Sequence, residues 1–276
     1  MKKISLFSFI LLFISCGGDD FKQRSELDGL RILAVTSDIP EANQVGAISI
    51  TPLLSDVNGE GRTLNYEYSF CPDPGINFGA EINCSQSLLS LKEEGSGSFD
   101  LSTLAASFYT GTVSSITINI TSQMLGYLSN LNAQLQFNGA DFLFILTLRD
   151  PNTNETKTAY RVIKLTSKET SQLNTNPTLG NIVSDNNALS SFPTGEIKLD
   201  VSNLSVPESY VLQTNVGLRS FTEDAYVSWY SNAGEFLFNR TDPNEENTFK
   251  PSKESGVIVA VYRDGRGGVS FEVLSL

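Results

Sequence analysis

The 276-residue chain contains three cysteines and no histidine, which limits the chemistry that its side chains can perform. Without histidine there is neither a Ser-His-Asp triad nor a Cys-His pair for nucleophilic catalysis. Zinc sites also depend on histidine or on several cysteines. Carboxylate pairs can hydrolyse glycosides, but no pair stands out among the 31 Asp and Glu residues. The composition therefore favours a non-catalytic protein.

The N-terminal residues predict a cleavable signal peptide. Lys2 and Lys3 precede an apolar run at residues 4–14. This run is too short for a membrane-spanning helix, which needs roughly 20 residues, and it is typical of a signal-peptide core. It leads into residues 13–16, Phe-Ile-Ser-Cys, which resemble the lipobox of bacterial lipoproteins. The resemblance implies cleavage after residue 15 and a diacylglyceryl group on the thiol of Cys16.

A lipid on Cys16 would hold the mature chain on a membrane, with residues 16–27 as the tether. Two or three acyl chains such as palmitate anchor firmly, at roughly 0.8 kcal/mol per buried methylene. Gly17 rather than Asp follows the cysteine, which resembles lipoproteins sorted to the outer membrane. We expect a cell-envelope location and no cofactor beyond this covalent lipid. An ordinary secretory signal is the alternative, although it prefers a small residue where Phe13 stands.

The remaining cysteines, Cys71 and Cys84, predict a disulfide, because an even pair in an exported chain is usually oxidised. The intervening residues are rich in turn formers and can fold back. Closing a loop of this length would stabilise the fold by about 3 kcal/mol. Two free thiols in a reducing compartment are the alternative reading.

The formal charge of −12 excludes one class of partner. Binding of DNA or RNA depends on clustered Lys and Arg, so we expect no nucleic acid partner. The excess of acid also disfavours contact with an anionic membrane surface and favours solubility. The expected partners are the membrane, through the lipid, and an envelope protein or glycan.

Alternation of β-branched and aromatic residues, interrupted by Gly, Pro, Asn and Asp, predicts an all-β fold. A short helix is expected at 122–131, and residues 85–110 could form a loop or an edge insertion. The expected strands are 30–37, 47–54, 63–70, 114–120, 142–148, 159–165, 196–201, 225–230, 256–263 and 269–274.

Two tandem antiparallel β-sandwich modules are expected, at residues 28–166 and 174–276, joined by a linker at 167–173. The linker has no apolar period and many turn formers. Each half has an aromatic strand and ends in a hairpin whose turn begins with Arg-Asp, at Arg149 and at Arg263. A tandem duplication explains this similarity, although β-proteins reuse such turns by chance.

The second half resembles the Ig-like and PKD-like modules of bacterial surface proteins. The resemblance rests on residues 227–230, 246–251 and 259–268, and it implies that Trp229 lies in the sandwich core and that an Asp-Gly, Gly-Gly hairpin closes the module. The whole chain also resembles uncharacterised two-module lipoproteins, through residues 30–35, Cys71-Pro72 and Asn176-Pro177. That resemblance implies a fold and no activity.

One loop formally matches a calcium pattern. Asp56, Asn58, Glu60, Gly61 and Glu67 occupy positions 1, 3, 5, 6 and 12 of an EF-hand-like spacing. Strands flank the loop where helices should be, so a plain connection between strands is the simpler interpretation, and no metal site is expected.

The interpretation favoured by the sequence is a membrane-anchored, non-catalytic envelope lipoprotein whose modules serve binding or adhesion. A structural spacer of the envelope and a carboxylate-based hydrolase are the alternatives. A binder should expose an apolar or concave patch, whereas a spacer should have polar faces and a rigid contact between modules. Phe236 and Phe238 are aromatic candidates for binding or for the core, and Asp264 is a candidate ion ligand or turn cap.

Overall fold

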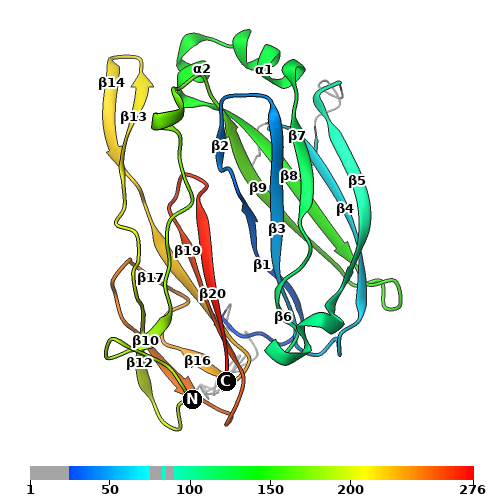
Figure 1. Ribbon diagram of the computed structural model, residues 1–276, viewed down its shortest axis with the longest axis vertical. Helices are drawn as coiled ribbons and strands as arrows, with labels where there is room; N and C mark the ends of the chain where they lie inside the picture. Colours follow the sequence, from blue (N-terminus) through cyan, green and yellow to red (C-terminus); the bar gives the residue numbers. More distant parts are fainter. Residues whose placement is uncertain (1–24, 75–82, 85–89) are drawn as a thin grey trace, which may run out of the picture.

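The computed structural model describes residues 25–74, 83–84 and 90–276, and it is an all-β sandwich protein, as the sequence predicts. The signal peptide, Cys16 and most of the predicted tether lie outside the described residues. Among the described residues, none of the helices has the length and apolar character needed to cross a membrane. The two halves of the chain lie side by side along the long axis of the molecule (Figure 1).

The N-terminal half is a sandwich of two sheets. The first sheet contains β1 (Leu30–Ser37), β3 (Gly46–Asp56), β6 (Thr110–Thr112) and β7 (Ile116–Ile120). The second sheet has the order β2 (Glu41–Ala42), β9 (Thr156–Leu165), β8 (Ala140–Arg149), β4 (Thr63–Pro72) and β5 (Glu93–Asp100). All pairs are antiparallel except β2 with β9. For residues 85–110 the sequence allowed either a loop or an edge insertion. The strand β5 lies within this range and forms an edge of the second sheet.

Alternation along the strands fills the core between these two sheets. In β7 the side chains of Ile116, Ile118 and Ile120 are buried, and the polar residues between them are exposed. The facing sheet contributes Phe142 and Phe144 from β8, both fully buried. Period-two alternation is what a strand with one buried face requires, and it is why these strands could be predicted.

Two short helices cover the upper end of this half (Figure 1). The helix α1 (Ser122–Ser129) confirms the predicted helix, and α2 (Ala133–Asn138) follows it. The hydroxyl of Thr121 caps α1 by accepting from the N–H of Met124. Among the described residues, 3-10 helices also span Leu101–Ser107 and Thr170–Gln172.

The C-terminal half has two sheets and a separate hairpin. One sheet has the order β11 (Asn187–Ala188), β10 (Ile182–Ser184), β12 (Ile197–Val201), β18 (Asn247–Pro251) and β16 (Gly234–Phe236). The other has the order β17 (Arg240–Thr241), β15 (Tyr226–Ser231), β19 (Val257–Arg263) and β20 (Val269–Ser275). The hairpin pairs β13 (Ser209–Thr214) with β14 (Gly217–Thr222) alone.

Trp229 occupies the core of this half, as expected for it. Its side chain is 1% exposed and packs against Phe236 at 5.4 Å between ring centroids. Its indole N–H donates to the hydroxyl of Thr241 at 3.0 Å, so burial leaves its polar group satisfied. Phe236 is therefore a core residue, whereas Phe238 is half exposed.

The pairing of strands repeats between the halves. In one sheet of each, β1-β3-β7 corresponds to β10-β12-β18. In the other, β4-β8-β9 corresponds to β15-β19-β20. This repeated order is what the predicted duplication requires. The division into two domains stays a prediction, because a third apolar cluster joins the halves.

Candidate functional site

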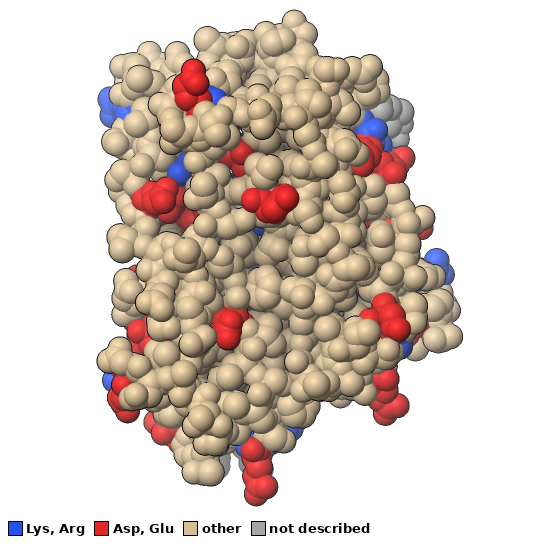
Figure 2. Space-filling model, in the orientation of Figure 1, with Lys and Arg blue, Asp and Glu red and all other residues tan. Residues whose placement is uncertain are grey.

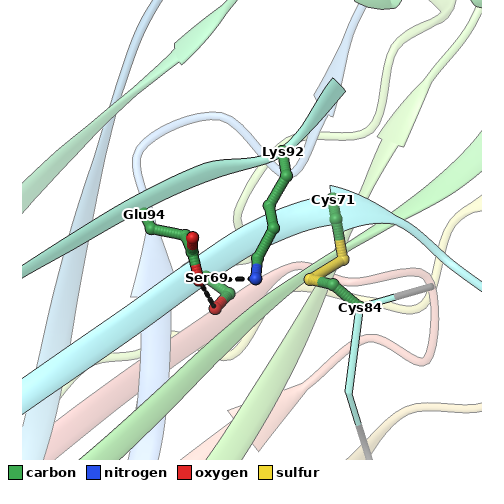
Figure 3. The surroundings of a disulfide bond; sticks show 5 residues. All are labelled: Ser69, Cys71, Cys84, Lys92 and Glu94. Atoms are coloured by element: carbon green, nitrogen blue, oxygen red, sulfur yellow. Dashed lines mark hydrogen bonds and ion pairs between the residues drawn. A yellow bond between two sulfur atoms is a disulfide. The ribbon is translucent and has the colours of Figure 1, made fainter. Parts of the chain in front are cut away.

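The predicted disulfide is present and has a structural setting. Cys71 is the penultimate residue of β4 and is bonded to Cys84, with their Cα atoms 5.9 Å apart. Both cysteines pack against Leu143 and Ile145 on the outer face of β8. Close to the bridge, Lys92, which directly precedes the edge strand β5, forms an ion pair with Glu94 of that strand (Figure 3). The bridge therefore fastens residues 83–84 to the sheet.

The candidate calcium loop holds a guanidinium instead. Both oxygens of Asp56 accept from Arg62, at 2.6 and 2.9 Å. The amide of Asn58 donates to a backbone carbonyl, Glu60 lies in the turn with φ of 51°, and Glu67 lies within β4. In the described part of the chain, no cluster of three or more His, Cys, Asp or Glu residues is placed to hold a metal ion.

Arg62 is the centre of this cluster, and no sequence pattern indicated this role. Its guanidinium also binds Asp150 at 2.5 Å and Glu155 at 2.9 Å, from the β8–β9 turn. These carboxylates raise the pKa of Arg62. Bonds from the Thr153 hydroxyl, a backbone N–H and Arg62 lower the pKa of Asp150 to about 2. The cluster ties the β3–β4 loop to the turn that closes the N-terminal half.

A buried apolar layer joins the two halves. On β19, the side chains of Val257, Val259 and Val261 face away from the Trp229 core and pack against the N-terminal half. Leu33 of β1 and Leu53 of β3 are buried on the opposite side of this contact. The consequence is that β19 is buried on both faces from its first residue to Tyr262.

Beside this layer lies a buried ionic network centred on Glu41. The carboxylate of Glu41 is 1% exposed and pairs with Lys168 at 2.9 Å and with Arg266 at 3.3 Å. It also accepts from the backbone N–H of Asn174 at 2.7 Å. Arg266 reaches a second acid, Glu223, at 3.3 Å. These residues come from both halves and from the segment between them.

The predicted linker at 167–173 lacks strands, as expected, but buried hydrogen bonds and an ion pair attach it and the adjacent Asn174 to both halves. Lys168 and Asn174 are buried. The amide of Asn174 donates to Asp264 at 2.9 Å, and Asp264 accepts from the N–H groups of Arg266 and Gly268 in the β19–β20 turn. Asp264 is therefore a turn cap. The contact between the halves is both apolar and hydrogen-bonded.

A different surface lies at the β13–β14 hairpin, which Figure 1 shows at the end of the long axis beside α1 and α2. All six residues of β14 are exposed, and β13 is its only strand partner among the described residues. Among the described residues, the exposed large hydrophobics concentrate at this hairpin and on the α2 side facing it. Val211, Val216, Leu218 and Phe221 lie in the hairpin, Val206 shortly before it and Leu135 on α2, whereas the other exposed large hydrophobics, Ile39, Val45, Tyr160, Leu237 and Phe238, lie elsewhere.

The hairpin is held to the body along β13. The side-chain amide of Asn138, at the end of α2, donates to the carbonyl of Gln213 at 2.8 Å and accepts from its N–H at 2.7 Å. The guanidinium of Arg266 lies over the ring of Tyr210 at 4.5 Å, and that ring stacks on Phe221. These contacts position the hairpin and leave the backbone of β14 as a free edge.

Comparison with family models and with curated proteins gives no match. No family model fits the chain, and no curated protein is significantly similar to it. The function is therefore inferred from the geometry of the described residues.

Proposed function

We propose that this protein is a lipid-anchored cell-envelope protein that binds an extended strand of another envelope protein along β14, without catalysis. The observation that carries the proposal is the free edge of β14, whose six residues are all exposed and include Leu218 and Phe221. Unprotected apolar edges are rare in soluble proteins because they pair with other chains. Addition of a partner strand is a common mode of recognition.

The orientation of the chain supports display of this edge away from the membrane. The first described residues, Ser25 to Leu27, pair with Ser231 beside the C-terminal end of β20. That end of the molecule is opposite the hairpin (Figure 1). Cys16 precedes Ser25 by nine positions, so the tether spans at most about 30 Å. A lipid on Cys16 would place the hairpin on the side distant from the bilayer.

Charge favours a foreign partner over a second copy. The hairpin, residues 209–222, carries Arg219 and no acidic residue. The chain as a whole has a formal charge of −12, and acidic side chains are spread over the visible face (Figure 2). Two copies therefore repel each other. A peptide strand can also form regular backbone hydrogen bonds with the N–H and C=O groups of β14. A glycan has no peptide backbone and cannot form this ladder.

A structural spacer is the second candidate, favoured by the buried contact between the halves. The two candidates share this rigid body and differ in the use of β14. A spacer without a ligand predicts that charges on β14 leave its function unchanged.

The anchor is tested by the intact mass of the protein from detergent-extracted membranes, with wild type beside Cys16→Ser. The expected mass is that of the chain from residue 16 plus two or three acyl chains, with this mass lost in the variant. A cleaved but unlipidated wild-type chain would contradict the anchor. It would leave a free exported protein whose β14 edge can be tested separately.

The binding edge is tested with a photoreactive amino acid at position 218, in cells that naturally contain the protein. Leu237 is the matched control position, because it is exposed to 66% against 65% for Leu218. We expect position 218, and not 237, to crosslink one extended segment of another envelope protein. A synthetic peptide of that segment should then slow hydrogen exchange of the β14 amides, and Leu218→Lys should abolish this protection.

Several results would contradict the binding edge. Equal crosslinking at both positions means nonspecific contact, and crosslinking to the same chain means self-association. A captured segment that leaves β14 exchange unchanged contacts the hairpin without adding a strand. Each result can occur with an intact lipid anchor, so the two parts of the proposal fail independently.

A further inference from the structure

A cleft of about 600 Å³ opens where the β19–β20 turn of one half meets the edge between β1 and β9 of the other. Its apolar walls include Ile32 and Val35 from β1 and Val162 from β9, and aromatic rings of Tyr160 and Tyr226 also line it. The volume lies within the range of small-molecule sites, about 300–1,000 Å³. This cleft is separate from the β14 edge.

Four basic side chains line the cleft, and they fall into two kinds. Lys164 is paired with Asp141, and Arg266 is paired with Glu41 and Glu223. The other two, Arg161 and Arg263, form no ion pair with any carboxylate among the residues that the structure describes. The chain has 31 acidic and 19 basic residues, so carboxylates that could pair with these two arginines outnumber the basic side chains.

Arg161 is buried, with 6% of the residue exposed. Its guanidinium donates to the backbone carbonyls of Val35 and Gly267, and its Nε has no hydrogen-bond partner within the described chain. Burial and the charge of Arg263 lower the pKa of Arg161 to about 10, against the opposing charge of Asp264. Arg161 therefore stays charged at neutral pH. Its buried charge has Asp264 as an electrostatic counter-charge but forms no ion pair among the described residues, so a further anion beside it would be stabilising.

Arg263 stands beside it on the turn side of the cleft. One of its terminal nitrogens donates to the carbonyl of Leu33 at 2.7 Å and the other to the hydroxyl of Ser228 at 3.1 Å. Its guanidinium lies 5.9 Å from the ring centroid of Tyr226. A guanidinium has five N–H donors, so donors remain on both arginines after these bonds.

We infer that the cleft binds a small organic carboxylate, with the carboxylate held by Arg161 and Arg263 and an apolar or aromatic body against β1 and Tyr160. A planar carboxylate matches the fork of a guanidinium and relieves the repulsion between two adjacent ones. The apolar walls and the tyrosines favour an organic body over a bare inorganic ion. The inference does not depend on the proposed edge of β14 or on the lipid.

The test is isothermal titration calorimetry on the full-length mature protein in detergent. The probes are benzoate, benzyl alcohol and inorganic phosphate, which separate the carboxylate from the ring and from other anions. We expect benzoate to bind one site, and benzyl alcohol and phosphate to bind at least tenfold more weakly.

Arg263→Gln should weaken benzoate binding at least tenfold, because it removes one charged donor. The matched control is Arg219→Gln, which removes the same charge from the exposed hairpin and should leave binding unchanged. Tyr160→Ala removes an aromatic wall that is 47% exposed and should weaken benzoate binding without unfolding the protein. This variant keeps the test decisive if Arg263→Gln does not fold.

Three results would overturn the inference. Absence of saturable benzoate binding at millimolar concentrations would show that the cleft is not a carboxylate site. Equal binding of benzyl alcohol makes it an apolar pocket, and tighter binding of phosphate makes it an inorganic anion site. Unchanged benzoate binding in both Arg263→Gln and Tyr160→Ala would place the ligand elsewhere.

Discussion

Two strands of the C-terminal half, β19 and β14, carry apolar residues and have opposite surroundings. Every residue of β19 up to Tyr262 is buried, with the Trp229 core on one face and the N-terminal half on the other. Every residue of β14 is exposed, and in the part of the chain that the structure describes only β13 pairs with it. Apolar character alone therefore does not fix burial, which depends on the number of layers that cover the strand.

The buried β19 contributes to the stability of the protein, whereas the exposed β14 is the strand to which we assign the proposed binding. Packing on both faces of β19 fixes the halves to each other, and removal of a side chain there leaves a void between two packed layers. Side chains on β14 are exposed in the folded protein, so they contribute little to its stability. An exposed apolar edge that persists without a structural role is a candidate for recognition.

The largest expected effect comes from a charge placed in each strand. Val259→Asp puts an unpaired carboxylate between the two halves, where Val259 is fully buried. It should lower the free energy of unfolding by more than about 4 kcal/mol. The matched Leu218→Asp, at a site 65% exposed, should change it by at most about 0.5 kcal/mol. Urea unfolding monitored by Trp229 fluorescence measures both, and similar losses would refute the contrast.

The polar part of the junction gives the next largest effect. Glu41→Gln leaves Lys168 without its buried partner and should destabilise the protein by about 3 kcal/mol, as loss of one member of a buried pair does. Glu246→Gln is the control, because its pair with Lys198 is exposed and should contribute less than about 0.5 kcal/mol. Thermal unfolding compares them. Equal effects would mean that the Glu41 network adds nothing beyond surface charge.

Strands of the sandwich cores could be predicted because burial on one face imposes alternation. The bounds of β1 agree with the prediction, and those of β8 extend beyond the predicted strand by two residues at the start and one at the end. The burial of both faces of β19 is also indicated by the sequence. Residues 257–262 are apolar without an intervening polar residue, which is typical of a strand covered on both faces.

The hairpin and the junction could not be predicted in the same way. Neither face of β14 belongs to a core, so Gly217–Thr222 has no apolar period. Glu41 and Lys168 are 127 residues apart in sequence, and each looks like an ordinary surface charge. Contacts of this kind depend on how the halves pack, and no local pattern encodes that packing.

A smaller and local effect is expected where the hairpin joins the body. Asn138→Ala removes two hydrogen bonds to Gln213 on β13 and should cost about 1 kcal/mol. We expect faster hydrogen exchange in β13 and β14, with exchange in β19 unchanged. The control is Asn152→Ala, because its side chain lies exposed in the β8–β9 turn. Uniform acceleration that includes β19 would show that the hairpin and the junction are one cooperative unit.

The smallest expected effect is a pH dependence at the base of the hairpin, where Glu223 follows β14 and pairs with Arg266. Burial, with the charges of Asp264 and Glu208, raises the pKa of Glu223 against the opposing effect of Arg266 and a backbone N–H. The folded state therefore holds this proton more tightly than the unfolded chain, so stability falls as the pH rises through the ordinary glutamate value towards the raised one. Urea unfolding from about pH 4 upward should show a shallower decline for Glu223→Gln than for wild type, with the exposed Glu254→Gln unchanged from wild type. If Glu223→Gln followed the wild-type profile, Glu223 would titrate as a solvated acid. The hairpin base would then belong with the exposed β14 rather than with the buried junction.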